Sequence, residues 1–413
     1  MSLPVIQESA PAAGAPGAAP AAGPPPGPAR TRELGGPGPA IALTLTMFVE
    51  AVGYGVVAPT LPFLARHAGA GERGIGLLVG LYAAVGLLVA IPFGVLANRY
   101  GRRILVLLGL ACLTVASVGF VFAPTYLWLV VARAAQGLGA AAVWVGALTM
   151  AADLSPDASM GRSLAWISGS WSLGFIMGPA LGGLGTVRTP FVLYAILAGA
   201  ALVAALVALP ETGRPGVRTS LAGILKVLRR PAVLLSGIAT FVMSYFYGSI
   251  EAFLPLFADG IGVGRLGIGL LFAVAGTPSI LFPRLTGWMA DRFGDNRVLF
   301  GGLLYCAVLS AGLLFALRSL PLWLVFFGIG IVEVSVYVPA VALLNRGISA
   351  EDRIFATGSH SYAFSCGFFL GPTIGGVLLP LGGYGLLFGS LAALSLLGVA
   401  CVVASRGRIA AGV

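Results

Sequence analysis

Charged residues are scarce in this chain, and their scarcity decides the class of protein. They make up 9% of the 413 residues, while hydrophobic residues make up 58%. A soluble domain carries roughly 25% charged residues. The chain has too few charges to cover a water-soluble globule of its length, so that class is excluded. The sequence predicts a protein whose main solvent is the lipid bilayer.

Histidine and cysteine are also rare, which removes several kinds of site. The two histidines, His67 and His360, show no metal-ligand spacing. The four cysteines all fall within apolar runs, and they imply no disulfide framework. The sequence contains no P-loop and no nucleophile signature. We therefore expect no metal, no cofactor and no catalytic residue, and a membrane enzyme or sensor is only a distant alternative.

Apolar runs of the roughly 20 residues that a helix needs to cross a bilayer occur twelve times. They cover about 41–64, 75–97, 104–122, 126–149, 163–185, 190–209, 233–258, 266–290, 298–317, 321–345, 356–380 and 384–404. The runs are continuous rather than alternating, which excludes a closed barrel. The predicted fold is an all-α membrane protein with twelve transmembrane helices.

Two short signatures occur twice, and both copies are separated by 193 positions. Residues 94–103 (GVLANRYGRR) recur in part at 287–294 (GWMADRFG), and 178–183 (GPALGG) recurs at 371–376 (GPTIGG). A fixed shift over this length indicates an internal duplication, here of six helices per half. In membrane proteins, such halves are typical of transporters with a site between them.

The order of segments follows from composition. Residues 1–40 are rich in Pro, Ala and Gly and lack the apolar core of a signal peptide, so we expect a disordered tail. The first half then covers 41–209, a basic linker covers 210–232, and the second half covers 233–404. Residues 405–413 form a short tail.

The net charge of +10 is a topology signal rather than a sign of nucleic-acid binding. With a cytoplasmic amino terminus, the inner segments hold 17 of the 24 Lys and Arg residues, the outer loops hold five, and two lie within spans. Positively charged residues stay on the cytoplasmic side. Both termini are therefore predicted to be cytoplasmic, in the cytoplasmic (inner) membrane of a bacterium, in a protein that we expect to be monomeric.

The loop after the second span resembles the G-x-L-a-D-R-x-G-R-R pattern of the major facilitator superfamily, within which the chain is similar to the twelve-helix drug:proton antiporters. Glycines in this loop permit a tight turn, and arginines can cap neighbouring helix ends. The acidic residue of the pattern is replaced by Asn98 in the first copy and kept as Asp291 in the second. A further acidic residue, Asp153, follows the fourth span and is expected to contact this loop. The residues concerned are Gly94, Asn98, Arg99, Gly101, Arg102, Arg103, Asp291, Arg292 and Asp153.

Residues 168–183 resemble the fifth-helix signature of these antiporters, a pattern typical of exporters. Gly174, Gly178 and Gly182 recur every four residues, so they form one bare helix face that a neighbouring backbone can approach. Pro179 removes a backbone donor and bends the helix, and Gly183 completes the motif. The resemblance implies export rather than uptake.

Two further segments carry polar residues of the same resemblance. Residues 133–141, which include Arg133 and Gln136, resemble the fourth-helix motif of these antiporters. The arginine of that motif faces the central cavity and is implicated in proton coupling. Residues 50–62 are similar to the first helix of tetracycline exporters and vesicular amine transporters, with Glu50 in place of the usual Asp. Tyr54, one turn later, is expected to line the same cavity.

Depth in the bilayer ranks the intramembrane charges, each of which costs about 2.5 to 3.5 kcal/mol at the bilayer centre. At about 1.5 Å per residue, Glu50 lies roughly 14 Å, Glu333 about 18 Å and Arg133 about 10 Å along their spans. We expect these three to form the centre for substrate and proton. Glu251, about 27 Å along its helix, is expected at a solvated helix end or, alternatively, at a substrate gate.

The function that these features favour is proton-coupled efflux of a small amphipathic organic molecule, a drug or a metabolite, by alternating access. Proton and substrate would compete for the same carboxylates, so their fluxes would be coupled. The alternative keeps the fold but makes the protein an uptake symporter for a sugar or organic anion held by Arg133. The expected partners are the small-molecule substrate, protons and the lipid bilayer.

Overall fold

The computed structural model describes residues 37–154, 160–212, 230–316, 321–345 and 350–410, and these residues form helices joined by short turns. Most of the predicted amino-terminal tail and linker lies outside the described residues. The first helix begins at Pro37, within the segment expected to be tail. The helix expected to end at residue 404 continues to Ala410.

The described part of the first half forms seven helices. They are α1 (Pro37–Val57), α2 (Leu61–His67), α3 (Glu72–Tyr100), α4 (Arg102–Phe122), α5 (Tyr126–Leu154), α6 (Met160–Gly182) and α7 (Thr189–Ala208). The predicted first span is interrupted, because the chain turns at residues 58–60 and the short helix α2 follows. Pro59 and Pro62 lie at this turn, where each lacks the N–H that a continuous helix would use.

The second half follows the same order. Its helices are α9 (Pro231–Gly260), α10 (Arg265–Gly276), α11 (Pro278–Leu281), α12 (Pro283–Phe293), α13 (Asp295–Ala316), α14 (Leu322–Asn345) and α15 (Ala350–Ala410). The predicted span at 266–290 is broken at Pro278 and Pro283, and its two arms are bent by 46°. Proline explains the break, because its ring removes a hydrogen bond and clashes with the preceding turn.

The number of spans is consistent with the predicted twelve. Nine helices of the described part are long and apolar enough to cross a membrane, and the bent pair makes a tenth. One of the nine, α15, contains a 50-residue apolar stretch and has non-helical backbone at Gly382 and Gly383. It therefore carries the two spans that the sequence separates at this point. The remaining span is α6, with 23 residues.

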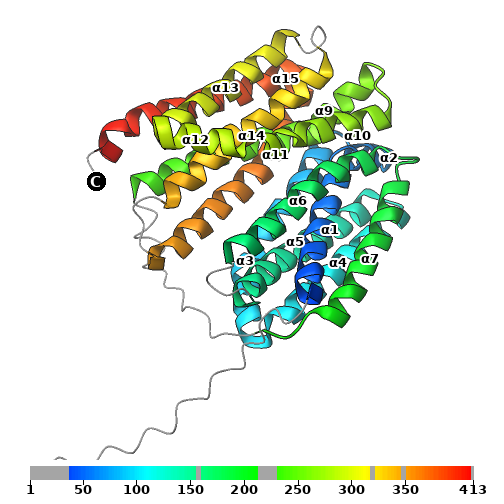
Figure 1. Ribbon diagram of the computed structural model, residues 1–413. Helices are drawn as coiled ribbons and strands as arrows, with labels where there is room; N and C mark the ends of the chain where they lie inside the picture. The colour runs from blue at the N-terminus through cyan, green and yellow to red at the C-terminus, as the bar shows by residue number, and fades with distance from the viewer. Residues whose placement is uncertain (1–36, 155–159, 213–229, 317–320, 346–349, 411–413) are drawn as a thin grey trace, which may run out of the picture.

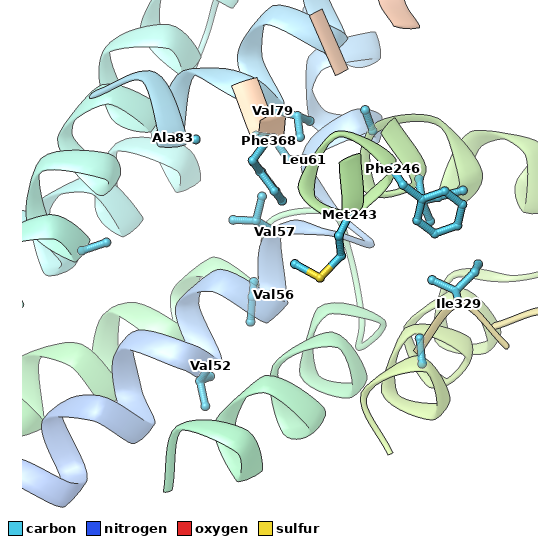
Figure 2. Packing of buried hydrophobic residues seen from close by; sticks show 14 of the residues in the cluster. Val52, Val56, Val57, Leu61, Val79, Ala83, Met243, Phe246, Ile329 and Phe368 are labelled. Carbon is cyan, nitrogen blue, oxygen red and sulfur yellow. The ribbon is translucent and has the colours of Figure 1, made fainter. Parts of the chain in front are cut away.

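The two halves form two bundles that meet at one end of the molecule and diverge toward the other (Figure 1). We call the meeting end, where α3 and α10 begin, the closed end. The opposite end, which carries residues 101 and 294, is the linker end. Apolar side chains fill part of the interface, and Figure 2 shows Met243 of α9 pointing toward Val56 and Val57 of α1. Met243 is 2% exposed.

Glycines make the contact at the closed end, in two places related by the duplication. A Cβ on Gly76 of α3 would collide with the carbonyl oxygen of Pro372 on α15, and one on Gly269 of α10 would collide with that of Pro179 on α6. Gly76 and Gly269 differ by 193, as do Pro179 and Pro372. We call these two contacts the glycine seams. They place the backbones of the two halves closer than any side chain would allow.

Candidate functional site

Glu50 lies on α1 and is 2% exposed. Its two carboxylate oxygens are bonded by different helices of the same half. The Tyr82 hydroxyl of α3 donates to Oε1 at 2.9 Å, and the Trp171 indole N–H of α6 donates to Oε2 at 2.8 Å. Both donors are uncharged. The predicted central carboxylate is therefore buried and held by neutral hydrogen bonds.

Arg133 lies on α5 and is fully buried. Its Nη1 donates to Gln136 Oε1 at 2.7 Å and its Nη2 to the Val79 carbonyl at 3.1 Å. Gln136 in turn donates to the Gly53 carbonyl of α1 at 3.1 Å. The guanidinium carbon lies 4.9 Å from the centre of the Tyr82 ring. Gln136 thus holds the arginine in place between α1, α3 and α5.

Glu251 differs from its expected position at a solvated helix end, and that prediction is wrong. It is 4% exposed, and it lies nine residues before the end of α9 at Gly260. The Tyr54 hydroxyl of α1 donates to Glu251 Oε2 at 2.9 Å, across the boundary between the halves. Arg133 lies within electrostatic range of the same carboxylate. Glu251 therefore belongs to the buried polar network.

Glu333, on α14, is half-buried and sits apart from the other two glutamates in its contacts. The Tyr247 hydroxyl of α9 lies 3.4 Å from Glu333 Oε2 and 3.0 Å from the Ile329 carbonyl. The structure thus joins Glu50, Arg133 and Glu251 through two tyrosines, and it places Glu333 in a second polar contact within the second half.

Two residues of this network, Tyr82 and Trp171, were not among the site residues that the sequence indicated. Trp171 lies inside the fifth-helix signature, one turn before Phe175, and the two rings stack at 5.2 Å with 14° between their planes. Tyr82 lies in an apolar run with no motif around it. The sequence feature that could have indicated both residues is an aromatic side chain with a hydrogen-bonding group inside a predicted span.

The loop signature after α3 is anchored within the first half. Arg102 forms an ion pair with Asp153, so the expected contact of Asp153 with this loop is present. Arg103 Nη2 donates to the Leu206 carbonyl in the last turn of α7 at 2.6 Å, which is the expected capping contact. Gly101 has a φ of 94°, which favours glycine at the turn. Gly94, by contrast, lies inside α3 and makes no turn.

The other residues of this signature lie in both copies of the repeat. Arg99 lies over the ring of Tyr100 at 5.3 Å. In the second copy, Arg292 lies 5.6 Å from the Trp288 ring, and Gly294 has a φ of 89°. Asp291 lies on α12, one residue before Arg292. The side chain of Asn98 lies outside the described residues.

The fifth-helix glycines form the predicted bare face, and the backbone that approaches it is that of α1. A Cβ on Gly178 would lie 2.6 Å from the Val52 carbonyl oxygen, and one on Gly174 would collide with the Phe48 carbonyl. A Cβ on Gly182 would lie 2.5 Å from the Pro59 ring. Gly183 faces the backbone of α10 in the other half. The motif therefore seals α6 against α1 and touches the closed end.

Metal binding has no support in the described part of the chain, where no group of three His, Cys, Asp or Glu side chains could hold an ion. The polar network consists of carboxylates, one guanidinium, phenols, an indole and an amide. Such a set can bind a proton or an organic ligand with charged and hydrogen-bonding groups.

Solved structures of transporters share this fold. A nucleoside transporter, NupG, superposes with a TM-score of 0.75 at 13% identity, covering 89% of this chain and 99% of that one. A peptide transporter, POT, solved in complex with sulfate, gives 0.73 at 16% identity, covering 90% and 94%. At these identities the likeness concerns the fold alone.

Sequence relatives include drug resistance proteins of bacteria. Multidrug resistance protein 1 of Bacillus subtilis is 28% identical over 357 residues, which cover 82% of this chain and 89% of the relative. Quinolone resistance protein NorA of Staphylococcus aureus is 26% identical over 348 residues, covering 81% and 88%. The chain also matches the Major Facilitator Superfamily over residues 43–317 and 238–410. This match means that the chain belongs to the Major Facilitator Superfamily.

Proposed function

We propose that this protein is a proton-driven exporter of small amphipathic organic molecules, and that it acts without chemical conversion of its substrate. The observation that carries the proposal is the buried network of Glu50 and Arg133 in the first half, which the Tyr54 hydroxyl joins to Glu251 of the second half. The relatives of this protein include proteins named for resistance to several drugs and to quinolones. A buried carboxylate that binds either a proton or a cationic group supplies the exchange that such export requires.

The orientation follows from charge. The linker end carries the excess of Lys and Arg, so we assign it to the cytoplasm and the closed end to the outside, with the protein in the inner membrane. The glycine seams at Gly76 and Gly269 then close the outer side, which corresponds to an inward-facing state. In this state, a substrate would enter from the cytoplasmic side.

Two unused hydrogen-bonding atoms support a ligand site at the network. Arg133 Nε and Glu251 Oε1 are buried, and neither has a hydrogen-bond partner among the described residues. A buried polar atom without a partner costs about 1 to 3 kcal/mol. A substrate or water with a donor and an acceptor could satisfy both atoms. We assign substrate contact to this region and proton exchange to Glu50, Glu251 and Glu333.

The energy available is sufficient for useful export. A membrane potential of 100 mV gives about 2.3 kcal/mol per charge moved. Since each 1.4 kcal/mol is about tenfold, this sustains roughly a fiftyfold gradient of substrate for one net charge. Export therefore requires no nucleotide hydrolysis.

The experiment is transport in proteoliposomes with an imposed pH gradient, using ethidium and a fluorescent quinolone as probes. We expect the gradient to drive both probes, and we expect Glu50→Gln to abolish the dependence on the gradient. Full proton coupling in Glu50→Gln would remove Glu50 from the mechanism. Accumulation of a sugar or organic anion inside expressing cells would favour the alternative, an uptake symporter in which Arg133 holds the anion.

A further inference from the structure

Tyr82 touches both parts of the buried network. Its hydroxyl donates to Glu50 Oε1 at 2.9 Å, and its ring carries the Arg133 guanidinium at 4.9 Å. The same ring lies 5.6 Å from the ring of Tyr54, whose hydroxyl donates to Glu251. One side chain on α3 therefore contacts Glu50 directly, and it also contacts Tyr54, which is bonded to Glu251.

The charges on the two sides of Tyr82 are unequal. The hydrogen bonds to Glu50 come from neutral groups, the phenol of Tyr82 and the indole of Trp171. On the other side, the positive charge of Arg133 lies within electrostatic range of Glu251. The Arg133 cation over the ring and the Glu50 carboxylate on the hydroxyl both polarise the Tyr82 phenol. In a buried site, two interactions that polarise one group strengthen each other.

Tyr82 also falls outside the symmetric scaffold. Adding the repeat distance of 193 to 82 gives Ala275, which has no phenol. The same shift leads from Glu50 to Met243 and from Arg133 to Phe326. Glu50, Tyr82 and Arg133 thus have no counterpart in the second half, whereas Tyr54 has one in Tyr247.

We propose that Tyr82 is a positioning residue that couples the occupancy of Glu50 to the occupancy of Glu251, acting through Arg133 and Tyr54. A proton or cation at Glu50 changes the hydrogen bond from Tyr82, the ring then holds Arg133 differently, and the field at Glu251 changes. The inference rests on the proposed function, because it assumes that both glutamates take part in binding or coupling.

A double-mutant cycle tests the coupling directly. Ethidium affinity is measured by fluorescence on the purified full-length protein at one pH, for the wild type, Glu50→Gln, Glu251→Gln and the double variant. Ethidium is chosen because its charge does not change with pH near neutrality. We expect the two substitutions to be non-additive by about fivefold or more in Kd, the lower end for coupled sites.

The same four proteins are then made with Tyr82→Phe, which keeps the ring under Arg133 and removes only the hydroxyl. We expect additivity within about twofold in this background, as for independent sites. The matched control is Tyr126→Phe, which also removes a tyrosine hydrogen bond of 2.9 Å between α5 and α3, to the Gly74 carbonyl. The coupling should survive in this control.

Each outcome decides between the claims. Equal non-additivity with and without the Tyr82 hydroxyl, or additivity in the wild-type background, would overturn the inference. A purely structural role for Tyr82 would change every Kd by a similar factor and leave the coupling intact. If the wild type binds no ethidium, or if both glutamate variants transport with full proton coupling, the proposed function fails, and the inference fails with it.

Discussion

Tyr54 and Tyr247 occupy equivalent positions in the two halves, and each hydroxyl points to a glutamate of the second half. The positions differ by 193, the repeat distance. Tyr54 donates to Glu251 at 2.9 Å, and Tyr247 lies 3.4 Å from Glu333. The first bond crosses between the halves, whereas the second stays within one. Only the hydrogen bond from Tyr54 to Glu251 must therefore break when the two halves move apart.

Replacing Tyr54 by Phe is expected to weaken the closed end. A hydrogen bond to a charged group contributes about 1.5 to 3 kcal/mol, so its loss shifts the equilibrium toward opening by about tenfold or more. The measurement is the distance distribution between spin labels at Ala68→Cys and Asp259→Cys, in a protein whose four native cysteines are replaced. Both label positions flank the closed end, after α2 and in the last turn of α9.

Tyr247→Phe is the matched control for this experiment. It removes the same hydroxyl from the equivalent position, but its partners Glu333 and Ile329 both lie in the second half. We expect the label distances to stay as in the wild type. If Tyr54→Phe also left them unchanged, the cross-half hydrogen bond would have no part in closing the molecule.

The glycine seams give a second prediction about the closed end. Gly76→Ala or Gly269→Ala places a methyl group against a proline carbonyl of the other half. Overpacking of this kind costs about 1 to 3 kcal/mol, which lowers the closed population by between about fivefold and 150-fold. A membrane-impermeant maleimide should then label Thr373→Cys, which lies beside Gly80 at the seam, more rapidly than in the parent.

A glycine on the same helix serves as the control for the seams. Gly86 of α3 has no atom within 4 Å of an added Cβ, so Gly86→Ala should leave the labelling rate of Thr373→Cys unchanged. Equal rates in the Gly76→Ala and Gly86→Ala proteins would mean that the seam tolerates a methyl group. The glycine at position 76 would then have no role in closure.

Features that depend on neighbouring residues follow from the sequence of this protein, whereas contacts between distant segments do not. The spans, the turn at Gly101 and the bare glycine face were predictable because each depends on residues a few positions apart. The burial of Glu251 was not, because Tyr54, which covers it, lies 197 positions away. Likewise Tyr82 is recognised as a site residue only through its hydrogen bond to Glu50, 32 positions away on another helix. Local pattern specifies the helices, while contacts between distant segments make the site.

Gln136 gives a prediction about the arginine that it holds. In Gln136→Ala, Arg133 Nη1 loses its acceptor in a fully buried place, which costs about 1.5 to 3 kcal/mol. We expect kcat/KM for ethidium efflux to fall about tenfold, because the guanidinium no longer stays fixed over the Tyr82 ring. Thr114→Ala removes a half-buried hydrogen bond to the Leu110 carbonyl in the same half, and it should have little effect. Similar kinetics for the two variants would contradict a positioning role for Gln136.

The ion pair of Arg102 and Asp153 lies wholly within the first half, and this location separates stability from transport. The two side chains are 9% and 11% exposed, so removing one partner leaves a nearly buried charge, at a cost of about 3 to 5 kcal/mol. Asp153→Asn should therefore lower the Tm in detergent, whereas Asp259→Asn, at an exposed carboxylate, should not. The folded Asp153→Asn protein should keep its KM for ethidium, because neither partner touches the buried network. An unchanged Tm together with altered label distances at the closed end would instead make this pair part of the conformational switch.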